Sequence, residues 1–215
     1  WAGGVTFIIV EQYSAERNTG DGRTMIVQLD RVSDWLDVPI PGSTPAVRLH
    51  RLHVDPETGA SLSLVRFPAG WSRPGTGFYA AAEEFVVLEG EIWVGRAFRA
   101  GDYAYLPPRT IRSASACEAG ALGPAWFSGA PTWAQGEPPT PPPGEPVVVT
   151  AGAPGGPARQ DAPEVPGSYR IADGPVVGAG RGCDVWCPQR REWEWVPAGQ
   201  TGELSSANLH VRTWA

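Results

Sequence analysis

Hydrophobic and polar residues alternate along much of the chain, as they do in strands that bury one face. Segments 47–54 (VRLHRLHV) and 60–67 (ASLSLVRF) flank the turn sequence DPETG, which predicts a β-hairpin. Further strand-like runs, separated by Gly or Pro, follow at 83–95 (EEFVVLEGEIWVG), 96–110 (RAFRAGDYAYLPPRT) and 121–129 (ALGPAWFSG). This spacing of short strands is typical of a sandwich or a closed barrel.

The pattern changes on both sides of this region. Short β-branched runs at 5–10 and 25–29 predict strands, whereas 11–24 reads as a loop and SDWLDVPIPG as irregular chain. Eleven prolines between 131 and 166 predict an extended connector, in which PVVVT could add an edge strand. We therefore expect an N-terminal extension over 1–44, a barrel over 45–130, a Pro-rich connector over 131–166, and a C-terminal β segment over 167–215 that packs on the barrel or on a partner subunit.

Composition supports an all-β fold and excludes several functions. The 215 residues include 27 Gly and 23 Pro, and the net charge is −6 without a basic run, which argues against nucleic acid as a partner. All 17 basic residues are Arg, so lysine Schiff-base chemistry is excluded. Cys117, Cys183 and Cys187 do not form a disulfide or zinc pattern, and no apolar run is long enough for a membrane span. We expect a cytoplasmic protein with no membrane partner.

Two spaced motifs then stand out. Glu83 is followed after six residues by Gly90, and Gly101 is followed after five residues by Pro107. Together with the flanking sequences DPETGASLSLVRFPAGW and GDYAYLPPRT, they resemble the two motifs of the cupin superfamily, in particular its anti-sigma-factor type. The resemblance covers about residues 45–130 and implies a cupin (jelly-roll) barrel whose interior ordinarily holds a divalent metal.

The resemblance also implies where the metal ligands would stand. Two His and a Glu come from the first motif and one His from the second; by spacing, these positions are occupied here by Gly77, Tyr79, Glu83 and Arg112. Only the glutamate is a ligand type, and the glycine position of the second motif holds Arg109. A guanidinium cannot coordinate a metal and would repel one, whereas a buried glutamate needs a counter-charge. We therefore predict a barrel without metal or other cofactor, in which Glu83 and Arg112 form an ion pair.

Strand alternation suggests which side chains share the barrel interior. If Glu83 points inward, Phe85 and Val87 do so too, while Glu84 and Val86 point outward. This reasoning predicts one pocket with polar and apolar walls. Its members are Tyr79, Glu83, Arg66, Arg112, Tyr103 or Tyr105, Phe85, Trp93 and Trp126.

The leading functional hypothesis is a metal-independent cyclase, isomerase or lyase of natural-product biosynthesis, acting on a hydrophobic small molecule, in a homodimer. Glu83 would be the general base and Tyr79 the acid, with Arg112 or Arg66 anchoring a carboxylate or enolate. Two alternatives remain open: a ligand-binding or sensory cupin without turnover, and a metal-dependent cupin oxygenase with atypical ligands.

Two other groups of residues favour structural roles. His50 and His53 are three apart on a predicted strand, so we expect them on opposite faces and outside any catalytic site. The chain has ten Trp, several of them in the C-terminal segment, where core or interface packing is the ordinary role.

Overall fold

The computed structural model describes residues 26–151, 157–159 and 167–215; the strand expected at 5–10 and the loop at 11–24 lie outside them. The expected all-β fold is confirmed: apart from loops and one 3-10 turn, η1 (Leu29–Arg31), the described chain forms strands that pair in antiparallel sheets. No helix of this part of the chain has the length and apolar character that a membrane span requires.

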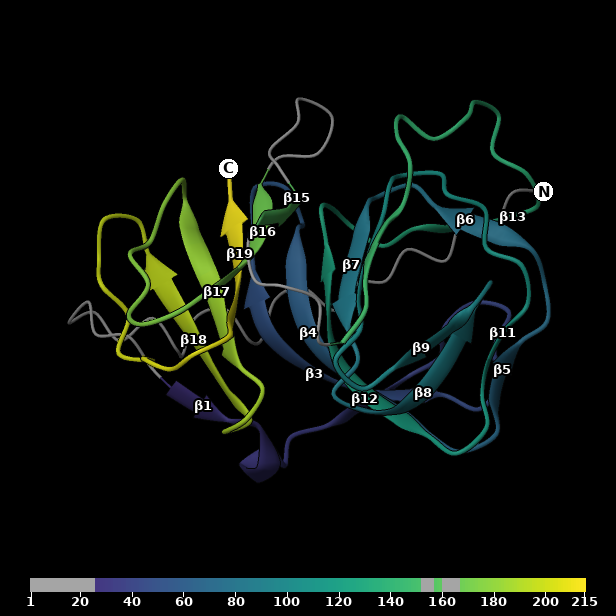
Figure 1. Cartoon of the computed structure of the whole chain (residues 1–215). Helices are drawn as coiled ribbons and strands as arrows, with labels where there is room; N and C mark the ends of the chain where they lie inside the picture. The colour runs from purple at the N-terminus through teal and green to yellow at the C-terminus, as the bar shows by residue number, and fades with distance from the viewer. Residues whose placement is uncertain (1–25, 152–156, 160–166) are drawn as a thin grey trace.

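The larger sheet, here called the barrel sheet, has eleven strands and curls into the barrel (Figure 1). Its members are β2 (Leu36–Val38), β3 (Val47–Val54), β4 (Ser61–Phe67), β5 (Trp71–Arg73), β7 (Glu83–Val86), β8 (Glu89–Val94), β9 (Ala97–Arg99), β10 (Tyr103–Leu106), β11 (Ser115–Cys117), β12 (Ala121–Phe127) and β14 (Val147–Val149). A separate two-stranded sheet pairs β6 (Gly77–Tyr79) with β13 (Trp133–Gln135).

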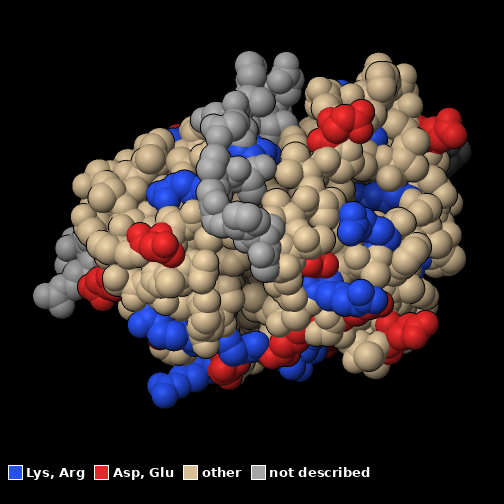
Figure 2. Space-filling model, in the orientation of Figure 1, with Lys and Arg blue, Asp and Glu red and all other residues tan. Residues whose placement is uncertain are grey.

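The second large sheet, here called the C-terminal sheet, lies against one side of the barrel (Figure 1). Its order is β1 (Ile26–Gln28), β18 (Glu192–Pro197), β17 (Gly182–Cys187), β19 (Leu209–Trp214), β16 (Ser168–Ala172) and β15 (Pro157–Arg159). Basic and acidic side chains are interspersed along the lower edge of the face shown in Figure 2, with no large patch of one sign there.

Most of the predicted strands are present. The hairpin predicted around DPETG is β3–β4, and the edge strand suggested by PVVVT is β14, which pairs with β10 at one end of the barrel sheet. The prediction of irregular chain at SDWLDVPIPG was wrong at residues 36–38, where β2 pairs with β3. All three cysteines are buried and free, as the sequence indicated.

The barrel interior is apolar and is organised around Phe85. Ala104 of β10 and Ala125 of β12 are its direct partners on either side, so these three side chains share the inner face. Phe85 also packs edge-on against Phe98. The inward direction expected for Glu83, Phe85 and Val87 therefore agrees with this register.

The opposite face of the same strands is buried as well, because the C-terminal sheet covers it. One core cluster combines Leu62, Leu64 and Tyr103 of the barrel sheet with Tyr169 and Trp186 of the C-terminal sheet. This shared core joins the two sheets into one packed body.

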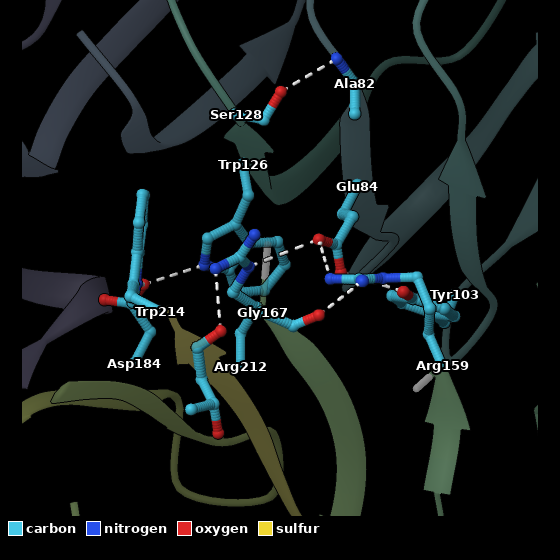
Figure 3. A network of polar contacts seen from close by, with 11 residues as sticks. Ala82, Glu84, Tyr103, Trp126, Ser128, Arg159, Gly167, Asp184, Arg212 and Trp214 are labelled. Carbon is cyan, nitrogen blue, oxygen red and sulfur yellow. Dashed lines mark hydrogen bonds and ion pairs between the residues drawn. The ribbon is translucent and has the colours of Figure 1, made fainter. Parts of the chain in front are cut away.

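A single carboxylate organises three tryptophans in this shared core. Asp184 is fully buried and accepts hydrogen bonds from the indole N–H groups of Trp126 (3.0 Å), Trp193 (3.0 Å) and Trp214 (2.6 Å). Trp126 belongs to the barrel and the other two to the C-terminal sheet, so the carboxylate links both sheets (Figure 3). Burial raises the pKa of Asp184, and the indole donors oppose that rise.

Glu84 makes the second link between the sheets. Its carboxylate accepts from Arg159 (2.7 Å), Arg212 (3.2 Å) and the Tyr103 hydroxyl (2.8 Å), as Figure 3 shows. Burial alone would raise the pKa of this carboxyl, but Arg212 and Arg159 hold it below its ordinary value. Glu84 therefore stays ionised inside the core.

The expected placement of two histidines was wrong. A β-bulge between Arg51 and His53 adds one residue to β3, so His50 pairs with Leu64 and His53 pairs with Leu62, on the same face. His50 is buried beside Asp34, with 2.9 Å between Nδ1 and the carboxylate, and His53 stacks on Trp195 at 4.0 Å between ring centroids. His53 thus belongs to the packing between the sheets, whereas His50 packs against the segment that precedes β2.

Candidate functional site

The four positions that correspond to the cupin ligand set come together at one end of the barrel. Gly77 and Arg112 exchange backbone hydrogen bonds of 3.0 and 2.8 Å. The Arg112 guanidinium forms an ion pair with Glu83 and lies over the ring of Tyr79, 4.9 Å from its centroid. The predicted Glu83–Arg112 ion pair is therefore present. We call Arg73, Gly77, Tyr79, Glu83 and Arg112 the barrel site.

Arg109 supports the register of the second motif. It stands where the resemblance places a glycine, and its φ of 66° lies in the left-handed region that glycine adopts readily. Its backbone N–H donates to the carbonyl of Tyr79 at 2.8 Å. The turn geometry thus follows the cupin motif although the glycine is absent.

Arg73 is a member of the site that sequence reasoning missed. Its guanidinium lies 3.8 Å from the ring centroid of Trp133, and its Nη1 donates to the Tyr79 hydroxyl at 3.4 Å. The available signal was its spacing, since Arg73 and the buried Trp71 are two apart on β5 and hence on one face.

The site has more positive than negative charge. Arg73 and Arg112 are each only 4% exposed, and Glu83 is the one carboxylate that pairs with either of them in the described chain. The Nε atoms of both arginines are buried without a hydrogen-bond partner there. Burial and the nearby Arg73 lower the pKa of Arg112 to about 9, against the opposing effect of Tyr79, so it remains charged at neutral pH. An anionic ligand group would satisfy these donors.

The residues of the barrel site do not fit the metal that the cupin resemblance implies. Glu83 is the only carboxylate at the four ligand positions, and the described residues contain no cluster of three His, Cys, Asp or Glu able to hold an ion. A Cβ at Gly77 would lie 2.3 Å from Trp133 Cζ2 and 2.4 Å from the Ala134 carbonyl oxygen, so this position accommodates no ligand side chain. We derive no chemistry through a metal here.

The other residues predicted for the pocket do not join the barrel site, and Phe85 lies in the apolar core of the barrel interior. Tyr103, Tyr105 and Trp126 neighbour the inward-facing alanines Ala104 and Ala125, and therefore point into the shared core instead.

The remaining two predicted pocket residues lie outside the barrel. The Arg66 guanidinium lies over the ring of Trp35, 5.0 Å from its centroid, and Trp93 is 48% exposed. The predicted single pocket is thus corrected to the smaller barrel site, because the alternation along β4, β8, β10 and β12 directs these side chains away from it.

Comparisons with known proteins identify the fold. Neither a family model nor a curated protein matches the chain. A solved protein from Nostoc punctiforme, described as a candidate dioxygenase, has a TM-score of 0.65 at 12% identity, over 91% of this chain and 83% of its own. The chain has the cupin fold.

Two further solved structures align over almost the whole chain. The glyoxylate-induced protein of Pseudomonas aeruginosa has a TM-score of 0.53 at 12% identity, over 89% of this chain and 88% of its own. The protein YlbA of E. coli has a TM-score of 0.52 at 13% identity, over 90% of this chain and 87% of its own. At these identities the likeness concerns the cupin architecture, including the C-terminal sheet, and carries no activity over to this chain.

Proposed function

We propose that the protein is a metal-independent cupin that binds a small hydrophobic molecule with an acidic group in its barrel site. One observation carries the proposal: the buried guanidiniums of Arg73 and Arg112 both lie against Tyr79, and among the described residues only Arg112 has a carboxylate partner, that of Glu83. An uncompensated buried cation is unfavourable, so a carboxylate or enolate ligand would stabilise the site while its apolar part packs on Tyr79 and Phe127.

The catalytic form of this proposal is proton transfer. When the ligand's anionic group binds the two arginines, it competes with Glu83 for Arg112 and leaves the glutamate free to accept a proton from a carbon next to a carbonyl. The Tyr79 hydroxyl returns a proton to another ligand atom, and exchange with water resets both groups. Isomerisation, cyclisation and elimination all proceed this way without an oxidant, which suits a cyclase, isomerase or lyase of natural-product biosynthesis.

A second candidate is ligand binding without turnover. It is favoured by the ion pair itself, because a carboxylate held by a guanidinium is a weak base unless the ligand displaces it. A metal-dependent oxygenase finds no support in the donor set of the barrel site.

Deuterium exchange separates the two candidates. Phenylpyruvate has a hydrophobic ring, a carboxylate and an acidic methylene group, so it is a suitable probe. In D₂O, followed by NMR, the full chain should bind phenylpyruvate and accelerate exchange of its methylene protons. Elemental analysis of the same sample should find no stoichiometric metal.

Variants assign the roles. Glu83→Gln should abolish the accelerated exchange while phenylpyruvate still binds, and Arg73→Met should weaken binding at least tenfold. Binding without exchange in the unmodified chain would favour the sensory candidate. No binding, or exchange that needs an added metal, would overturn the proposal.

A further inference from the structure

A cleft of about 370 Å³ lies where the barrel sheet meets the C-terminal sheet, away from the barrel site. Its barrel side comes from β7, β10 and β14, and its other side from β16, β19 and the turn between β17 and β18. The residues that matter for its chemistry are Tyr103, Val149, Tyr169, Gln189, Asn208 and His210. The volume is within the range of small-molecule sites.

Tyr169 and His210 form a hydrogen-bonded pair in the wall of this cleft, between the phenol oxygen and imidazole Nδ1. Burial and the charge of Glu84 raise the pKa of Tyr169, and burial lowers the pKa of His210 to about 4. At neutral pH the phenol is therefore protonated and the imidazole neutral. Because the hydroxyl has no other acceptor in the described part of the chain, it donates to Nδ1, and the ring hydrogen of His210 is on Nε2.

The pair is fixed in place by the buried network behind it. Tyr169 stacks on Tyr103, with ring centroids 3.8 Å apart and planes within 8°. The Tyr103 hydroxyl donates to one carboxylate oxygen of Glu84, and Arg159 and Arg212 pair with the other oxygen (Figure 3). His210 Nε2 has no partner among the described residues, so a rigidly positioned N–H donor is left available to the cleft.

The charge of the walls indicates which ligand fits. None of the described residues that line the cleft is an aspartate or glutamate. Its one arginine, Arg191, is already paired with Asp30 and with Glu89, the latter at 2.5 Å. A cleft without spare charge offers little to an ion, whereas its aliphatic walls and neutral donor suit an uncharged molecule with an acceptor oxygen.

We propose that this cleft is a second ligand site, which binds an uncharged, largely apolar molecule through a carbonyl oxygen that accepts a hydrogen bond from His210 Nε2. Gln189 and Asn208 add amide groups at the cleft wall. The site is independent of the proposed chemistry in the barrel, since it shares no residue with the barrel site.

Three related probes test the ligand class by NMR, on the full chain with ¹⁵N-labelled histidine. The neutral ketone 2-acetylnaphthalene should bind saturably and shift the His210 imidazole signals, but not those of His53. Before addition, the ¹⁵N shifts should show the Nε2–H tautomer. The hydrocarbon 2-methylnaphthalene lacks an acceptor oxygen and should bind at least about threefold more weakly, as the net strength of one hydrogen bond suggests. The anion 2-naphthoate keeps its acceptor oxygens but finds no spare positive charge, so it should also bind at least about threefold more weakly.

Three variants test the residues. His210→Phe keeps a ring but removes the donor, so the ketone should bind about threefold to tenfold more weakly, at the level of 2-methylnaphthalene. The matched His53→Phe should leave ketone binding unchanged, and Val149→Trp, which fills the cleft, should abolish it. If His210→Phe does not fold, the shifts in the unmodified chain decide. Unperturbed His210 signals, tighter binding of the naphthoate, or full affinity in His210→Phe would each overturn the proposal.

Discussion

The guanidinium of Arg73 lies over the indole of Trp133, 3.8 Å from the ring centroid, and the same indole lies against the backbone of Gly77. Any side chain at position 77 would collide with Trp133. The absence of a side chain there thus lets Trp133 pack against the barrel site, where its ring lies beneath the second buried guanidinium, that of Arg73.

Removing the Arg73 guanidinium should weaken ligand binding without lowering the stability of the fold. In Arg73→Met the buried charge without a carboxylate partner is lost, so the free energy of unfolding should stay the same or rise by about 1 kcal/mol. Affinity for a hydrophobic carboxylate should fall by at least about tenfold, because a charge-assisted hydrogen bond disappears. Urea denaturation and calorimetric titration measure the two quantities. The exposed Arg99→Met is the control, and equal affinity in both variants would contradict the assignment.

The contributions of Glu83 and Arg112 to the free energy of unfolding should be strongly coupled. Glu83→Ala leaves a buried guanidinium without its counter-charge and should lower the free energy of unfolding by about 3 kcal/mol. Adding Arg112→Met should restore part of that loss in a double-mutant cycle. The exposed pair Glu91–Arg99, 2.6 Å apart, provides a matched cycle in which each change should matter by less than about 1 kcal/mol. Similar coupling in both cycles would show that burial is unimportant.

Asp184→Asn should weaken the packing between the barrel sheet and the C-terminal sheet. An asparagine has one acceptor oxygen for three indole donors, so at least one buried N–H loses its partner. We expect the free energy of unfolding to fall by about 3 kcal/mol and the tryptophan emission to change. Denaturation followed by fluorescence measures both effects. The control Asp37→Asn, at an exposed position, should change neither the free energy of unfolding nor the tryptophan emission. An Asp184→Asn protein of unchanged stability and emission would contradict the role of this carboxylate.

Stability should decline in mild acid because of His210. Its pKa is lowered from 6.5 to about 4 in the folded chain, so between these values the unfolded chain binds a proton that the folded chain does not. The contribution is complete above about pH 6.5 and is lost as the pH falls toward 4, by at most about 3 kcal/mol. His53 shifts the same way, mainly through burial. Urea unfolding from pH 8 to pH 4 should show a shallower decline in His210→Phe; an identical decline would count against this.

The sequence pattern identified the strands well because they alternate, but it could not tell what covers each face. Glu84 was expected to point out of the barrel, and it does, yet it is only 2% exposed because the C-terminal sheet packs there. The same ambiguity misplaced Tyr103 and Trp126, which alternate with inward-facing alanines. Period-two patterns distinguish two faces; they do not say which is the inside when both are buried.

At the candidate site, motif spacing predicted the Glu83–Arg112 ion pair that the structure contains, since cupin motifs fix positions along the turn and strand. Arg73 was missed because it comes from a strand outside both motifs and meets the site only through the fold. The face of β3 on which His53 lies was predicted wrongly for a different reason. A β-bulge leaves no signature in the polar pattern of β3, yet every side chain after it points to the opposite face from the one that simple alternation predicts.

The pairing of β1 with β18 has a bearing on how this molecule could have arisen. The strand nearest the start of the described chain completes an edge of the last sheet, while the whole barrel is threaded between them. A single cut in the chain cannot separate the barrel sheet from the C-terminal sheet with both intact, because it would divide β1 from its partner β18. Descent by simple end-to-end fusion of two finished modules would therefore require a later exchange of this strand.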